Sequence, residues 1–74
     1  MNHVRQYRKL EGLSQLELAK KVNVARQTIN LIENDKYNPS LSLCIDLAKA
    51  LKTDLNTLFW EDDNNEEALE GKYI

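Results

Sequence analysis

The sequence LSQLELAKKVNVARQTINLIE, residues 13–33, decides the fold. Its first signal is Ser14 followed three residues later by Glu17, which is the spacing of a capping box at the start of a helix. Leu13 and Leu18 have the spacing of a hydrophobic staple around that cap. The pattern therefore predicts a helix that begins immediately after Ser14.

Two short helices joined by a tight turn are expected within this stretch. The first spans 15–22, Asn23 then takes the positive φ that a three-residue turn requires, and the second spans 26–33. Ala19 is placed where the two helices cross, since a larger side chain there would push them apart. Four apolar residues lock the pair: Leu18, Val22, Ile29 and Ile32. This is a helix-turn-helix pattern, which DNA-binding proteins share with other helical hairpins.

Three further helices complete the expected all-α domain. A helix over 2–11 ends at Gly12, whose backbone can take the left-handed conformation of a helix terminus. Ser40 caps a fourth helix, which has apolar residues at i, i+3 and i+4 spacing, and Asp54 caps a short fifth helix. The sequence therefore predicts five helices around one core.

Charge divides the 74 residues into a basic domain, residues 1–60, and an acidic C-terminal segment, residues 61–74. The whole chain has a net charge of −2, but residues 1–60 contain nine Lys and Arg against six Asp and Glu, a net of +3. A chain of this length encloses a single core. The low overall charge therefore conceals a basic body that suits a polyanionic partner.

The remaining composition excludes several classes of protein. One Cys and one His cannot form a structural zinc site or an internal disulfide, so no metal or cofactor is expected, and a reducing compartment fits. No apolar run is long enough to cross a membrane and no signal peptide is recognisable, which predicts a cytoplasmic protein. The chain has no nucleophile–base pair and no phosphate-binding loop, so it is not expected to be an enzyme.

The helix-turn-helix and its surroundings resemble the Cro/C1-type family, also called the xenobiotic-response-element family. The matching runs are Leu13-Ser14-Gln15, Leu18-Ala19, Arg26-Gln27-Thr28-Ile29-Asn30, Ile32-Glu33, Tyr37-Asn38-Pro39-Ser40-Leu41 and Leu47-Ala48. Together they extend over about residues 4–60. The resemblance implies a five-helix, lambda-repressor-like domain that binds double-stranded operator DNA, usually as a homodimer, in bacterial and phage regulators. We therefore expect a sequence-specific transcriptional repressor that binds a palindromic site.

Carried over to the matching positions, the resemblance assigns DNA contacts to the second helix of the motif and its neighbours. Base contacts are expected from Arg26, Gln27, Thr28, Asn30 and Leu31, and backbone contacts from Gln15, Asn34, Lys36 and Tyr37. The chemistry agrees, because Arg can fork onto guanine, Gln and Asn can pair with adenine, and a Thr methyl can touch thymine. Arg8 and Glu33 match a pair that joins the first helix to the end of the reading helix and orients it.

The sequence departs from the family pattern at four positions. Ala25 replaces the Ser or Thr that often caps the reading helix, which removes an acceptor worth about 1 kcal/mol. Asn23, Asp35 and Lys52 stand where the family usually has glycine. Asn tolerates the left-handed region better than Asp, and Lys tolerates it poorly. The left-handed turns of the family are therefore in question at Asp35 and Lys52.

The apolar residues near the end of the basic domain have two interpretations: they cover the monomer's own core, or they form a two-fold interface. We expect a shared role for Leu55, Leu58, Phe59 and Trp60, since a small domain needs additional apolar burial and aromatic residues dominate interfaces. The acidic segment is a candidate binding site for an additional protein partner. The alternative function is accordingly a protein-interaction module, such as the antitoxin of a toxin–antitoxin pair.

Overall fold

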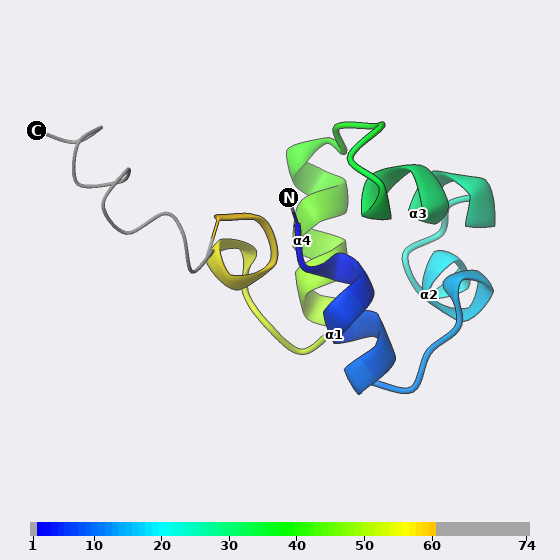
Figure 1. The fold of residues 1–74 in the computed structure, drawn as a ribbon, viewed down its shortest axis with the longest axis horizontal. Coiled ribbons are helices and arrows are strands. Elements are labelled where there is room, and N and C mark those ends of the chain that lie inside the picture. Colours follow the sequence, from blue (N-terminus) through cyan, green and yellow to red (C-terminus); the bar gives the residue numbers. More distant parts are fainter. Residues whose placement is uncertain (1, 61–74) are drawn as a thin grey trace, which may run out of the picture.

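The computed structural model describes residues 2–60, which fold as five helices around one core (Figure 1). The helices are α1 (Val4–Leu10), α2 (Gln15–Lys21), α3 (Arg26–Glu33), α4 (Leu41–Ala50) and the π-helical turn η1 (Asn56–Trp60). The predicted all-α, five-helix fold is confirmed for this part of the chain. Residue 1 and the acidic segment 61–74, with the partner role expected of it, lie outside the described residues. None of the described helices is long and apolar enough to cross a membrane.

Side-chain caps start three of the helices. The capping box at α2 is complete: the Ser14 hydroxyl accepts from the Glu17 amide at 3.0 Å, and the Glu17 carboxylate accepts from the Ser14 amide at 2.8 Å. Ser40 accepts from the amide of Leu43 at 3.1 Å at the start of α4. The Asp54 carboxylate accepts from the Thr57 amide at 2.7 Å at the start of η1. The caps predicted from the sequence are thus confirmed.

The first and the fifth helices differ from the forms expected from the sequence. The first helix begins at Val4 and ends at Leu10, and is therefore shorter than the predicted 2–11. The Asn2 side chain stands before it and accepts from the Val4 amide at 3.0 Å, so Asn2 precedes the helix. The fifth helix is a π-helical turn, and its Leu58 carbonyl accepts from the His3 amide at 2.8 Å. This bond ties η1 to the segment before α1.

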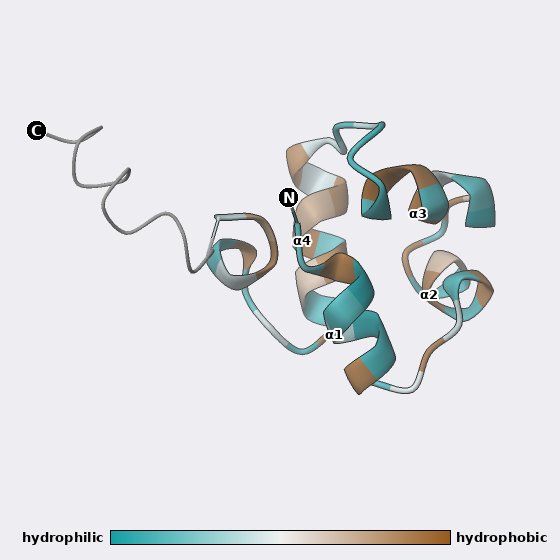
Figure 2. Ribbon diagram, in the orientation of Figure 1, coloured by the Kyte–Doolittle hydropathy of each residue, from teal (hydrophilic) through white to brown (hydrophobic). Residues whose placement is uncertain are grey.

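The core holds ten apolar residues, which come from all five helices and from the residues that directly follow α2 and α4. The members are Val4, Leu18, Ala19, Val22, Ile29, Ile32, Leu47, Ala48, Leu51 and Leu58. Hydrophobic and hydrophilic residues are both present along α2 and α3, as expected for amphipathic helices with one apolar face (Figure 2). In Figure 1, α2 and α3 lie on one side of α1 and η1 lies on the other. The buried core therefore fixes α3 while leaving one of its faces at the surface.

Three residues other than glycine adopt the left-handed conformation, at positions where the family usually has glycine. The φ angles are 60° at Asn23, 57° at Asp35 and 58° at Lys52. The turns at Asp35 and Lys52, in question from the sequence, thus keep the left-handed geometry. Each costs about 1–2 kcal/mol relative to the right-handed region for a residue with a Cβ. Each of these turns ends a helix and directs the backbone back toward the core, so the left-handed conformation is kept despite this cost.

Candidate nucleic-acid interface

The outward face of α3 carries most of the residues expected to read bases. Arg26, Gln27, Asn30 and Leu31 are exposed, and Thr28 is half-buried. The opposite face is held in the core by Ile29 and Ile32, which are fully buried. Because residues i, i+1, i+4 and i+5 share one face of a helix, the four exposed side chains form a single strip, which we call the α3 strip (Arg26, Gln27, Asn30 and Leu31).

The N-terminus of α3 has no side-chain cap. Ala25 occupies the N-cap position with extended φ and ψ of −72° and 149°, and no side chain accepts from the first-turn amides. The effect of the missing Ser or Thr, predicted from the sequence, is therefore visible in the structure.

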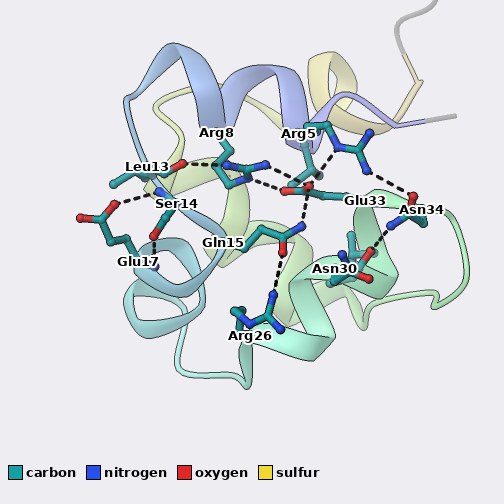
Figure 3. Close-up of polar contacts among 12 residues, drawn as sticks. Arg5, Arg8, Leu13, Ser14, Gln15, Glu17, Arg26, Asn30, Glu33 and Asn34 are labelled. Carbon is teal, nitrogen blue, oxygen red and sulfur yellow. Dashed lines mark hydrogen bonds and ion pairs between the residues drawn. The ribbon is translucent and has the colours of Figure 1, made fainter.

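The C-terminus of α3 is anchored by a buried carboxylate. Glu33 has a side chain with 0% exposure, and its Oε2 accepts from Arg8 Nε at 2.6 Å (Figure 3). A second nitrogen of the same guanidinium, Nη2, donates to Oε1 at 3.3 Å, and Nη1 donates to the Leu13 carbonyl at 2.8 Å. The structure thus brings together the pair that the resemblance selected, and joins α1 to both the end of α3 and the start of the α2 cap.

Two further side chains, which the sequence analysis did not place in this cluster, reach the same carboxylate. Arg5 Nε lies 3.2 Å from Glu33 Oε1, and Gln15 Nε2 donates to that oxygen at 3.1 Å. We call Arg5, Arg8, Gln15 and Glu33 the Glu33 cluster. A signal for Arg5 was present, since positions i and i+3 of a helix share a face and Arg5 and Arg8 have that spacing.

These contacts keep Glu33 ionised despite its burial. Desolvation alone raises the pKa of a buried carboxyl group. In Glu33 that effect is outweighed by hydrogen bonds from Arg8, Gln15 and Arg5, so that the pKa lies below its ordinary value. The carboxylate is therefore charged at neutral pH, and none of the buried side-chain nitrogen and oxygen atoms among the described residues lacks a hydrogen-bond partner.

Gln15 also connects the Glu33 cluster to the α3 strip. Its Oε1 accepts from Arg26 Nη1 at 3.2 Å, while its Nε2 faces Glu33 (Figure 3). A carboxylate can only accept hydrogen bonds, which fixes the amide nitrogen toward Glu33 and the amide oxygen toward Arg26. Gln15 is half-buried, and both ends of its amide form hydrogen bonds within the protein. It is therefore not simply a side chain that projects toward DNA.

The loop after α3 presents the other residues expected at the DNA backbone. Asn34, Lys36 and Tyr37 are all exposed. The Asn34 amide is engaged in closing α3: its Nδ2 donates to the Asn30 carbonyl at 2.8 Å, and its Oδ1 accepts from Arg5 Nη2 at 3.2 Å. Lys36 and Tyr37 carry no such side-chain contact among the described residues.

The segment expected to form a dimer interface divides between core and surface. Leu58 is fully buried within the monomer, so of the shared role expected for it the structure shows the part in the monomer's own core. Leu55 and Phe59 are half-buried, whereas Trp60 is 56% exposed. With four residues of the preceding loop and α4 (Asn38, Pro39, Leu41 and Cys44) these three line a largely apolar hollow of about 330 Å³.

Comparisons with known proteins agree with this geometry. A family model described as helix-turn-helix matches residues 4–58. An uncharacterised helix-turn-helix-type transcriptional regulator of Methanocaldococcus jannaschii is 46% identical over 63 residues, which are 84% of this chain and 96% of the relative. The immunity repressor of Bacillus phage phi105 is 37% identical over 59 residues, which are 80% of this chain and 41% of that protein.

A solved structure extends the likeness to three dimensions. The crystal structure of SinR, the master regulator for biofilm formation, in complex with DNA matches with a TM-score of 0.68 and 34% sequence identity. The match covers 73% of this chain and 87% of the SinR chain.

Proposed function

The chain belongs to the helix-turn-helix family of DNA-binding transcriptional regulators, and from this premise we propose that it is a sequence-specific repressor that binds a palindromic operator as a homodimer. The observation that carries the proposal is the α3 strip, whose polar side chains stand at the surface of a helix anchored from behind. The similarity to a phage immunity repressor and to SinR, which was solved in complex with DNA, supports repression and DNA binding.

The side chains of α3 have the chemistry that base readout in the major groove requires. Arg26 can donate two hydrogen bonds to guanine, and Gln27 and Asn30 can each pair with adenine. Leu31 and the methyl group of Thr28 can contact a thymine methyl. Each well-formed bidentate contact discriminates against a wrong base by about 1–3 kcal/mol. We assign these five residues to base contacts in the proposed complex.

Residues beside α3 are assigned to the sugar-phosphate backbone, which positions a protein on the duplex without reading sequence. Lys36 and Tyr37 are exposed in the loop that leaves α3, and Asn34 closes the helix end next to them. Gln15 lies at the start of α2 beside Arg26. These four residues flank the α3 strip at both of its ends.

Two copies of the chain would place their α3 strips in successive major grooves, about 34 Å apart on one side of the duplex. The surface that suits this pairing is the apolar hollow beside η1. Trp60 is 56% exposed and Leu41 is 66% exposed at its border, so apolar area remains available for a partner. Leu55 and Phe59 line the same hollow and complete the proposed interface.

Selection of bound sites from random duplexes, followed by fluorescence anisotropy on the selected site, tests the proposed DNA binding. The protein is expected to enrich a two-fold symmetric sequence, and Gln27→Ala is expected to change the base preference at one position of each half-site while the salt dependence stays the same. Gln6→Ala is the matched control, because Gln6 is an exposed glutamine on α1 and not on α3. No enrichment, or equal base preference in the two variants, would refute the assignment.

Light scattering tests the proposed dimer. Trp60→Ser is expected to shift the protein toward monomer and to weaken binding to the full palindrome while binding to a half-site is kept. Leu10→Ser is the matched control, since Leu10 is an apolar residue that is 70% exposed and does not line the hollow beside η1. If both variants keep the mass of the parent, the interface does not involve Trp60.

A further inference from the structure

Arg5 is the exposed cation of a cluster that carries one surplus positive charge. Two guanidinium groups, those of Arg5 and Arg8, share the single carboxylate of Glu33. The Arg8 side chain is only 11% exposed, and all three of its nitrogens are engaged by Glu33 and the Leu13 carbonyl. The surplus charge is therefore available to solvent at Arg5, whose side chain is 48% exposed.

The Arg5 guanidinium is held in place on one side and open on the other. Nε lies 3.2 Å from Glu33 Oε1, and Nη2 donates to Asn34 Oδ1 at 3.2 Å. Among the described residues, Nη1 has no hydrogen-bond partner. A guanidinium presents its donors in a flat fork, so the open edge formed by Nη1 and the second hydrogen of Nη2 can take two oxygens of one phosphate.

The position of Arg5 places this open edge beside the end of the α3 strip. Asn34, its partner, directly follows α3 and is four residues beyond Asn30 and eight beyond Arg26, so the three lie along one stripe. In the helix-turn-helix geometry the reading helix enters the major groove while the first helix of the motif crosses the backbone. The N-terminal residues of the reading helix contact the base edges, which leaves the C-terminal end of α3, and the Arg5 guanidinium fixed beside it, toward the phosphates that border the groove.

We propose that Arg5 is a phosphate-binding residue, supplied by α1 and pre-oriented by Glu33 and Asn34, that clamps the DNA backbone at the C-terminal end of α3. This proposal rests on the proposed DNA-binding function and adds a contact that neither the sequence analysis nor the family resemblance selected. Because two hydrogen bonds already restrict the side chain, little rotamer freedom remains to be lost when a phosphate binds.

The salt dependence of binding measures this contact directly. Each phosphate neutralised by a protein cation contributes about −0.9 to the slope of log K against log salt concentration on duplex DNA. Arg5→Gln is expected to reduce the magnitude of that slope by about 0.9 for each chain that is bound. It is also expected to weaken binding to the selected operator and to a random duplex by the same factor, since a phosphate contact carries no sequence information.

Lys52→Gln is the matched control for the removal of one ion-paired positive charge. Lys52 Nζ lies 3.5 Å from Glu11 Oε1 at the opposite end of α1, about 9 Å along the helix axis from Arg5. It is expected to leave the slope of the parent unchanged. Arg5→Lys keeps the charge and is expected to restore the slope that Arg5→Gln loses, and circular dichroism confirms that each variant is folded before titration.

The outcomes separate this proposal from the function on which it rests. If the parent selects no site, the proposed function fails. If the parent binds its operator but Arg5→Gln keeps the parental slope, Arg5 serves only to support Glu33 and the phosphate assignment is overturned. Equal losses of slope in Arg5→Gln and Lys52→Gln would also overturn it, because they would reflect net charge and not a local contact.

Discussion

Replacing Glu33 by glutamine is expected to be the most destabilising isosteric change in the domain. The substitution keeps the volume of the side chain, so no cavity forms, and it removes only the negative charge. The Glu33 side chain is fully buried and Arg8 is 11% exposed, so water cannot replace the carboxylate as a partner for the Arg8 guanidinium. The glutamine amide has only one oxygen to accept hydrogen bonds. The carboxylate that it replaces offers two oxygens to the same donors.

The magnitude follows from burial. Removing one partner of a buried ion pair costs about 3–5 kcal/mol. Arg5 adds little to this value, because it is 48% exposed and an exposed pair is worth about 0–1 kcal/mol. The whole stability of a domain of this size is about 3–5 kcal/mol. The two quantities are comparable, so Glu33→Gln is expected to be largely unfolded in buffer at room temperature.

Urea denaturation followed by far-ultraviolet circular dichroism measures the loss. With an m-value of about 1 kcal/mol per M, the loss moves the midpoint down by about 3 M or more, to near zero urea, so the variant should show a reduced helical signal even without denaturant. Glu17→Gln is the control, since a glutamine at this position can still complete the capping box with Ser14. The reasoning fails if Glu33→Gln loses no more stability than Glu17→Gln, because the charge of the carboxylate would then contribute nothing to folding.

Three further predictions concern acid, a missing cap and a strained turn. The pKa of Glu33 is lowered in the folded state, so its stabilisation is complete above the ordinary carboxyl range and is lost as pH falls through the folded pKa. The thermal midpoint of the parent should therefore drop as the pH falls through and below that range, and a midpoint that stays constant there would contradict this prediction. Ala25→Ser should add the side-chain acceptor that the N-terminus of α3 lacks and raise the free energy of unfolding by about 1 kcal/mol. The gain should appear as a higher urea midpoint, and an unchanged midpoint would argue against an uncapped helix start. Lys52→Gly should relieve the left-handed strain at φ 58°. The greater entropy of glycine in the unfolded chain offsets part of this gain, so the free energy of unfolding should rise by about 0.5 kcal/mol, again measured by urea denaturation. A lower free energy of unfolding would show that Lys52 is not strained.

The parts of the fold that local chemistry determines were predictable from the sequence. The bounds of α3 match the predicted 26–33, and the complete capping box at Ser14 confirms the start of α2. Both follow from side chains that act on the backbone within one helical turn. The apolar spacing of 13–33 needs no distant residue to be interpreted.

The burial of Leu58 shows what the local sequence pattern could not predict. Leu55, Leu58, Phe59 and Trp60 form one apolar run, and composition alone gives no reason to separate a core residue from an interface residue. The structure separates them because the Asp54 cap starts η1, and within this turn Leu58 is fully buried in the core whereas Trp60 is exposed. That division depends on the packing of helices that are far apart in the sequence.

The Glu33 cluster was only half predictable for the same reason. The pairing of Arg8 with Glu33 came from the resemblance, across a sequence separation of 25 residues. Arg5 and Gln15 reach the same carboxylate across separations of 28 and 18 residues, and their residue types are equally typical of solvated helix surfaces. Nothing in their local sequence indicates that α1 and α2 bring them to one oxygen.

The buried charge of Glu33 nevertheless determines what can stand at the outer end of this cluster. Because the carboxylate only accepts, Gln15 must turn its nitrogen inward and its oxygen outward. The outward oxygen needs a hydrogen-bond donor, and Arg26 supplies one through Nη1. The rest of the Arg26 guanidinium stays available for the proposed base contact. An acidic side chain at position 26 would meet that oxygen with like polarity. The buried Glu33 carboxylate therefore favours, through the Gln15 amide, a hydrogen-bond donor at the first position of α3.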